Sequence, residues 1–142
     1  MTGHNDPLYR EALLRLARDT RFRGPLAGAD RRATAVNELC GDELCVELAL
    51  AEDGRVAELR CTVRGCAIVA ASARLLAELA GGAGREQLRR WREQFAAVLA
   101  GAELPGGLEL LRPLLALRDR RSRHGCALLP WRALDLALDS EP

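Results

Sequence analysis

The hydrophobic residues of the chain recur with two different periods, which separate helical segments from extended ones. From about Pro7 to Arg18 they follow helical spacing, and proline suits the first turn of a helix. The segments Glu43 to Leu50 and Val56 to Arg64 alternate instead between apolar and polar residues, as half-buried strands do. Because a short turn containing Gly54 separates the two segments, the pattern predicts an antiparallel hairpin.

Residues two apart in a strand share a face, so the alternation also predicts which side of the hairpin is buried. The predicted buried face carries Leu44, Val46, Leu48, Leu50, Ala57, Leu59, Cys61 and Val63. Cys45 falls on the opposite, mixed face beside Glu43 and Glu47. We therefore expect Cys61 to be a small core residue, as free cysteines often are, and Cys45 to have no specific role.

Helical periodicity returns in the second half of the chain. One predicted helix begins at Cys66 and ends at the Gly81-Gly82 pair. Another runs from about Arg85 to Ala100 and directs Trp91 and Phe95 inward, where both are expected to be core residues.

The remaining segments are shorter or less regular. A third helix, Leu108 to Leu117, contains Pro113, which should kink or divide it. The last helix follows Cys126, with Pro130 predicted in its first turn. The stretch from Thr20 to Asn37 has no apolar period and is predicted to be a surface loop. This order of elements predicts an α+β fold, a small antiparallel β-sheet packed against several helices.

Length and charge narrow the classes of protein that fit. The 142 residues, 49% of them hydrophobic, suit a single domain spanning residues 1–142. With 21 basic and 20 acidic side chains the net charge is only +1, so neither nucleic acid nor an anionic membrane is an expected partner. No secretory signal is apparent, nor an apolar stretch of the roughly 20 residues that span a bilayer. We therefore expect a cytoplasmic protein.

Five cysteines in a reducing compartment indicate metal or sulfur chemistry more than a disulfide framework. Three of them stand at predicted boundaries between elements: Cys40 before a strand, and Cys66 and Cys126 at the beginnings of helices. A thiol at a helix N-terminus faces free backbone N–H groups, which favour its thiolate. Asp42 adds an oxygen donor two residues after Cys40.

Together Cys40, Asp42, Cys66 and Cys126 form a set of three sulfurs and one oxygen that suits zinc. The same set could hold an iron–sulfur cluster, although a carboxylate is a weaker partner for a cluster than a fourth thiolate. The spacing alone does not separate such a site from three unrelated thiols, because no paired C-x-x-C motif is present.

A cysteine hydrolase is the weakest of the alternatives. It would use Cys66 or Cys126 with His124, and the other histidine, His4, stands near the N-terminus. We expect His124 to be a solvated loop residue or a spare ligand rather than a catalytic base.

Several of these motifs resemble the U-type iron–sulfur cluster assembly proteins, the family of SufU, IscU and the N-terminal domain of NifU. The motifs are Leu8-Tyr9-Arg10-Glu11, Arg23-Gly24-Pro25-Leu26, Cys40-Gly41-Asp42, Gly65-Cys66-Ala67-Ile68 and the stretch from Arg123 to Trp131. Arg123, Trp131 and the long interval between Cys66 and Cys126 are similar to the SufU branch. The scaffold branch carries a histidine immediately before its last cysteine, where this chain has Gly125.

The resemblance implies a zinc protein that accepts persulfide sulfur from a PLP-dependent, SufS-like cysteine desulfurase and passes it to the iron–sulfur assembly machinery. It implies Cys40, Asp42, Cys66 and Cys126 as zinc ligands, with Cys40 as the persulfide acceptor and Cys126 as the second candidate. Arg123 and His124 are auxiliary candidates. Two alternatives stay open: a scaffold that builds and transfers a [2Fe–2S] cluster on the same four residues, and a purely structural zinc domain that binds a protein partner.

Overall fold

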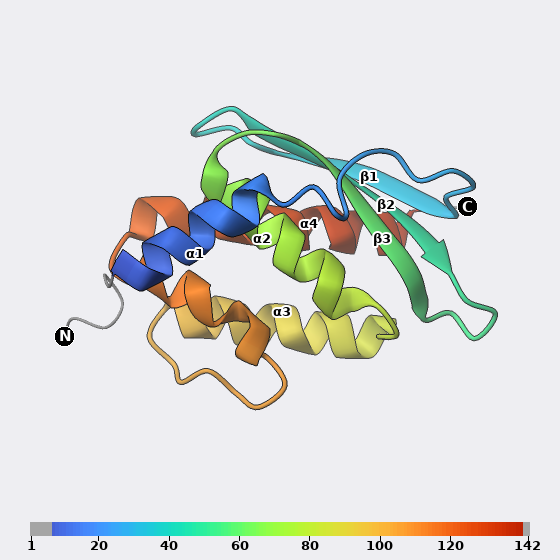
Figure 1. Ribbon diagram of the computed structural model, residues 1–142. Helices are drawn as coiled ribbons and strands as arrows, with labels where there is room; N and C mark the ends of the chain where they lie inside the picture. Colours follow the sequence, from blue (N-terminus) through green and yellow to red (C-terminus); the bar gives the residue numbers. More distant parts are fainter. Residues whose placement is uncertain (1–6, 141–142) are drawn as a thin grey trace.

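The computed structural model describes residues 7–140, which form a three-stranded sheet with helices on one side (Figure 1). The elements, in chain order, are α1 (Pro7–Arg18), β1 (Arg31–Asn37), β2 (Asp42–Leu50), β3 (Val56–Arg64), α2 (Ala67–Ala80), α3 (Arg85–Leu99), the 3₁₀ helices η2 (Glu109–Leu117) and η3 (Arg121–Arg123), and α4 (His124–Asp139). The α+β architecture predicted from the sequence is therefore confirmed.

The strands lie in the order β1-β2-β3, and both pairs are antiparallel. The predicted hairpin is β2–β3, and Leu44, Val46 and Leu48 of β2 are fully buried, as their alternation indicated. Cys61 of β3 is 3% exposed, which confirms it as a core residue. The sheet thus buries one face and leaves β1 and β3 at its edges.

One part of the predicted buried face is wrong. Ala57 is exposed and Val56, one residue earlier, is 2% exposed instead. The cause is a shift in register between Ala49 and Leu50, after which Leu50 pairs with Val56. Because side chains alternate across a strand, this shift exchanges the faces of the residues beyond it.

Strand β1 is a second departure from the sequence prediction, which assigned residues 20–37 to a loop. Its inward residues are small, Ala33 and Ala35, and they alternate with the exposed Arg32, Thr34 and Val36. Alanine gives only a weak hydrophobic period, so the alternation was not distinguished from an irregular stretch. Pairing with β2 supplies the hydrogen bonds that make this segment a strand.

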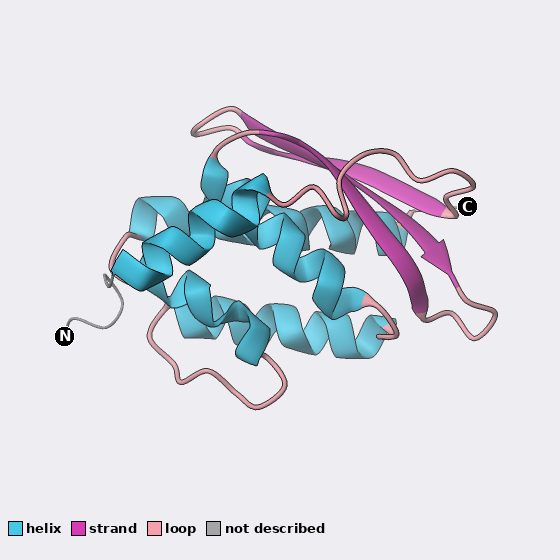
Figure 2. Cartoon of the chain, in the orientation of Figure 1, coloured by secondary structure: helices cyan, strands magenta, loops and turns pink. Residues whose placement is uncertain are grey.

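The helices lie on one side of the sheet (Figure 2), and α2 and α4 are the ones that pack against it. Helix α2 is the central one: seven of its residues, among them Val69, Ala71 and Leu76, form part of the main core. Helix α4 lies against β1 and β2, and α1 crosses α2. Phe95 of α3 contacts Trp131 of α4, with ring centroids 6.0 Å apart, so Phe95 is a core residue as expected. Trp91 is half-buried against the same core.

The last two helical segments differ in detail from the prediction. The segment with Pro113 forms the 3₁₀ helix η2 rather than an α-helix. Helix α4 begins at His124, so Cys126 lies in its first turn and Pro130 lies in its interior. The polar residues Arg121–Arg123 form η3, which continues directly into α4.

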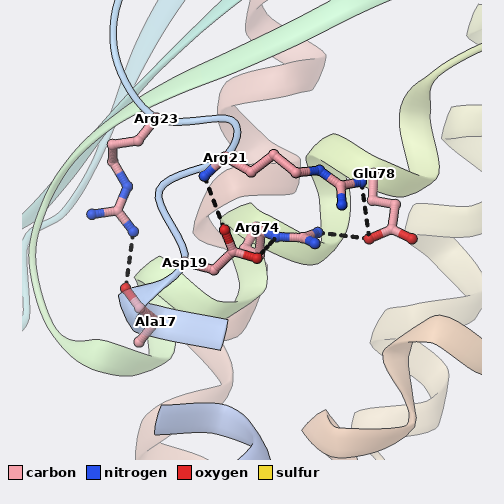
Figure 3. Close-up of polar contacts among 6 residues, drawn as sticks. All are labelled: Ala17, Asp19, Arg21, Arg23, Arg74 and Glu78. Atoms are coloured by element: carbon pink, nitrogen blue, oxygen red, sulfur yellow. Dashed lines mark hydrogen bonds and ion pairs between the residues drawn. The ribbon is translucent and has the colours of Figure 1, made fainter. Parts of the chain in front are cut away.

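A network centred on Arg74 of α2 fixes the segment that follows α1 (Figure 3). The Arg74 guanidinium contacts Asp19 Oδ2 and Glu78 Oε1, both at 2.7 Å, and lies over the Phe22 ring. The segment also pairs with the edge of β3, because the Cys61 N–H donates to the Phe22 carbonyl at 3.0 Å. Among the described residues no helix is long and apolar enough to cross a membrane.

Candidate metal centre

The tight turn between β1 and β2 presents Cys40 at the end of the sheet. Asn37 and Asp42 are paired across the two strands, and the N–H of Gly41 donates to the Asn37 carbonyl at 2.7 Å. Gly41 has a φ of 76°, which glycine adopts without steric cost. The turn leaves Leu39 96% exposed and Cys40 exposed beside it, while Asp42 is 6% exposed.

The Asp42 carboxylate is held by the beginning of α2. Cys66 is the N-cap residue of that helix, and its backbone N–H donates to Asp42 Oδ1 at 3.2 Å. Gly65 makes this contact possible, since a Cβ on Gly65 would lie 2.8 Å from Asp42 Oδ1. A side chain at this position would therefore displace the carboxylate.

The third component, Cys126, comes from the first turn of α4 and is 1% exposed. The next residue, Ala127, is fixed to α2 because its carbonyl accepts a 2.6 Å hydrogen bond from the buried Ser72 hydroxyl. Pro130 has no N–H, so the Cys126 carbonyl lacks its usual partner four residues along the helix.

Three potential ligand atoms meet where these elements converge. The sulfur of Cys40, the sulfur of Cys126 and a carboxylate oxygen of Asp42 all lie within 4.8 Å of one another. The Cys40 sulfur is 2.9 Å from Asp42 Oδ2 and 3.8 Å from the Cys126 sulfur. We refer to these three residues as the Cys-Asp-Cys cluster.

The cluster fits a tetrahedral metal ion. Zinc–sulfur bonds of about 2.3 Å separate two sulfur ligands by about 3.8 Å in a regular tetrahedron, which is the distance between Cys40 and Cys126. The Cys40–Asp42 distance is that of a hydrogen bond, so these two groups would move apart slightly around an ion. Two soft sulfurs and one hard oxygen suit zinc, and the chemistry of the donors also permits iron.

The protonation of the cluster follows from burial and mutual contacts. Burial alone would raise the pKa of Asp42, but hydrogen bonds from the Cys40 thiol and the Cys66 N–H outweigh it and lower the pKa. Burial, with the neighbouring Cys66 and Cys40 thiols, raises the pKa of Cys126 to about 12. The metal-free cluster is thus a carboxylate that accepts hydrogen bonds from its neighbours, and a metal must displace the thiol protons.

Cys66 is adjacent to the cluster, but its sulfur is not among the three atoms that lie together. Its backbone N–H binds Asp42, and its half-exposed thiol lowers the pKa of Asp42 further. Of the four residues expected to be ligands, the structure therefore brings three together directly and places the fourth at the neighbouring helix N-terminus.

The two auxiliary candidates, Arg123 and His124, lie in different environments. Arg123 is exposed at the N-terminus of α4 and lines a cavity together with Cys66. His124 is half-buried, and its Nε2 is 2.8 Å from the Leu117 carbonyl. His124 is thus not the solvated loop residue that the sequence suggested, because it lies in the first turn of α4, where it contacts the end of η2.

Asn37 is a component of the site that the sequence prediction missed. Its side-chain N–H donates to the Cys126 sulfur at 3.9 Å, and its Oδ1 accepts from the Leu39 N–H at 3.2 Å. Asparagine is common where a turn begins, and this was the available signal. The two thiols outside the site behave as expected: Cys61 is buried, and Cys45 lies on the mixed face near Arg32.

Two thiols and a carboxylate at one end of a sheet with helices on one face form a candidate metal site in an α+β protein. Residues 8–94 match the family model of the NifU-like N-terminal domain. The iron–sulfur cluster assembly scaffold protein IscU of Thermotoga maritima is 31% identical over 132 residues, which is 92% of each chain. The chain therefore belongs to this family, the U-type proteins of iron–sulfur cluster assembly.

Solved structures show the same fold. The N-terminal part of a nitrogen-fixing NifU-like protein from Brucella abortus is 28% identical, with a TM-score of 0.84 over 96% of this chain and 95% of that chain. A protein described as a cluster assembly scaffold for the SUF system of Fervidobacterium islandicum AW-1 is 21% identical. Its TM-score is 0.82 over 91% of this chain and 95% of that chain, and this likeness concerns the fold alone.

Proposed function

We propose that this protein is a SufU-like, zinc-dependent sulfur acceptor in iron–sulfur cluster assembly, which takes persulfide sulfur from a PLP-dependent cysteine desulfurase. The observation that carries the proposal is the asymmetry of the cluster. Cys40 is exposed at the tip of a turn, whereas Asp42 and Cys126 are buried beneath it. A buried pair suits metal retention, and an exposed thiol suits transfer between proteins.

In this proposal Cys66, Cys126 and Asp42 hold the zinc, and Cys40 is the ligand that is released to react. Bound zinc would keep the thiols of the site deprotonated at neutral pH. The Cys40 thiolate attacks the outer sulfur of the desulfurase persulfide, so that a new S–S bond forms at Cys40. The bond to the desulfurase cysteine breaks, and that cysteine leaves as a thiolate.

The surface around Cys40 supports transfer to another protein. Leu39, at 96% exposure, is the most exposed large hydrophobic residue in the described part of the chain, and it directly precedes Cys40. An apolar side chain in that position can be buried by a partner when Cys40 enters its active site. Cys126, the second candidate acceptor, is buried and has a raised pKa, which favours Cys40 for this role.

The test is a desulfurase assay with the purified zinc-loaded protein and its Cys40→Ser variant. The wild type should stimulate turnover and acquire one sulfur of additional mass, and the variant should do neither. The Cys45→Ser variant, altered at a thiol outside the cluster, is the matched control and should behave as the wild type does. Unchanged stimulation by Cys40→Ser would refute the acceptor role. Metal analysis of Asp42→Ala beside the wild type then tests whether the carboxylate retains zinc.

A second candidate function is a scaffold that assembles a [2Fe–2S] cluster and transfers it. The relative from Thermotoga maritima, which is named a scaffold protein, favours it. Anaerobic reconstitution with iron and sulfide distinguishes the two functions. A stable cluster that can be passed to an apo-ferredoxin supports the scaffold, whereas zinc that resists replacement by iron supports the sulfur acceptor.

A further inference from the structure

A cavity of about 470 Å³ lies beside the Cys-Asp-Cys cluster, between α1, the beginning of α2 and the end of η2. Its apolar lining includes Leu13 and Leu14 of α1 and Ile68 of α2. Cys66 lies in its wall, so the cavity reaches the one proposed ligand that stands apart from the other three. Its volume lies within the range of cavities that hold small molecules.

Three arginines surround this cavity: Arg10 from α1, Arg120 before η3, and Arg123 at the N-terminus of α4. Within residues 7–140 none of their guanidinium groups has an ion pair or hydrogen bond, and no acidic residue lines the cavity. The planar guanidinium group matches a carboxylate with two parallel hydrogen bonds. The cavity therefore combines an apolar lining with an unneutralised positive rim, which fits an anion that has an apolar part.

We propose that the cavity binds a low-molecular-weight thiol that carries carboxylates, with the carboxylates on the arginines and the sulfur next to Cys66. This inference rests on the proposed function, because a thiol bound there would lie beside the sulfur-handling site. The half-exposed Cys66 thiol, at a helix N-terminus, is the group of the cavity wall that a second sulfur would meet.

The test is calorimetric titration of the zinc-loaded full chain with reduced glutathione at low ionic strength. Glutathione should bind at one site, and the Arg10→Gln/Arg120→Gln double variant should bind it at least about tenfold more weakly. Arg112→Gln, which alters an exposed arginine outside the cavity, should stay within about twofold of the wild type. Equal affinity of the wild type and the double variant would overturn the proposal.

Two further ligands test the role of the sulfur and the role of the arginines separately. S-methylglutathione, whose sulfur is blocked, should bind more weakly than glutathione, and equal affinity would remove the thiol from the inference. The neutral thiol 2-mercaptoethanol should show no saturable binding, and binding as tight as that of glutathione would refute the role of the arginines. Protection of Cys66 from alkylation by bound glutathione in the metal-free wild-type protein, where no zinc covers this thiol, gives a second readout.

The Cys40→Ser variant distinguishes this proposal from the proposed function. Cys40 does not line the cavity, so this variant should bind glutathione as the wild type does even though it accepts no sulfur. Loss of glutathione binding in Cys40→Ser would contradict the assignment of the ligand to this cavity. If instead the wild-type protein bound glutathione but stimulated no desulfurase, the cavity assignment would stand and only the sulfur-acceptor function would be refuted.

Discussion

Gly65 is the residue whose small size most directly shapes the cluster. Its missing side chain leaves the space that the Asp42 carboxylate occupies, and a methyl group there would approach Asp42 Oδ1 to 2.8 Å, which is too short for a real contact. In the sequence, Gly65 stands out only as part of the motif Gly65-Cys66-Ala67-Ile68. The structure shows that the group requiring the space is the carboxylate itself.

Gly65→Ala is therefore expected to displace Asp42 and to weaken zinc binding by about tenfold to a hundredfold. Competition with a chromogenic chelator measures this affinity. Gly81→Ala is the matched control, because nothing lies within 4 Å of the position of its Cβ. If Gly65→Ala bound zinc as tightly as the control, Asp42 could not be a ligand in the arrangement described here.

The reactivities of the five thiols should differ widely in the folded, metal-free protein. Burial raises the pKa of Cys61 to about 12, so this thiol stays protonated at pH 8 and is shielded from reagents. Alkylation with iodoacetamide at pH 8 should modify the exposed Cys40 first and the buried Cys61 and Cys126 last, as peptide mass spectrometry can measure. In denaturant the difference should disappear. Equal rates in the folded protein would contradict the core position of Cys61.

At the level of elements, the contacts of Asp19 link stability to pH. Hydrogen bonds from Arg74 and from the Arg21 N–H lower the pKa of Asp19, so the folded state favours its ionised form. The resulting stabilisation is present above the ordinary value of 3.8 and is lost as the pH falls through the lowered pKa of the folded state.

Asp19→Asn should therefore unfold at a lower urea concentration than the wild type at pH 7, and the difference should shrink below about pH 3.8. Urea midpoints measured from pH 7 to pH 2.5 test this expectation. Asp119→Asn, at an exposed aspartate without a described ion pair, is the control. A difference between Asp19→Asn and the wild type that stays constant across this range would contradict the ion pair with Arg74.

The elements differ in how far the sequence predicted them. Helix α1 and strand β3 have the predicted bounds because their apolar periods are strong. Strand β1 was missed because alanines form its inward face. The register shift between Ala49 and Leu50 was missed because an alternating sequence pattern does not reveal where the pairing of two strands changes. The convergence of Cys40, Asp42 and Cys126 was expected from their positions at boundaries and from the family resemblance. The role of Asn37 was not predicted, because it depends on contacts between β1 and α4.

At the level of the whole molecule, the core is extensive, and Cys126 is the member of the Cys-Asp-Cys cluster that belongs to it. The buried residues of α2, α4 and the sheet form one continuous cluster, which includes Leu44, Leu76 and Trp131. A core of this kind can fold without a metal, unlike a small zinc domain whose ligands take the place of a core. This distinguishes the proposed acceptor from a purely structural zinc domain.

Removal of zinc with a chelator should accordingly leave the far-UV circular dichroism spectrum unchanged in shape. Addition of zinc at a hundred times its Kd should raise the Tm by about 5–10 °C, because the ion binds the folded state preferentially. Thermal scans with and without chelator measure both effects. Loss of the helical signal on removal of zinc would instead support the structural domain.

The short distance between the sulfurs of Cys40 and Cys126 also has a consequence for the resting protein. At 3.8 Å, and on elements far apart in the sequence, the two thiols need only a small approach to become joined by oxidation. Such a cross-link would tie the tip of the β1–β2 turn to α4 and remove the Cys40 thiol hydrogen that Asp42 accepts. An ion held between the thiols would therefore also protect them from oxidation by air. Metal-free preparations need a reductant to keep both thiols available as ligands.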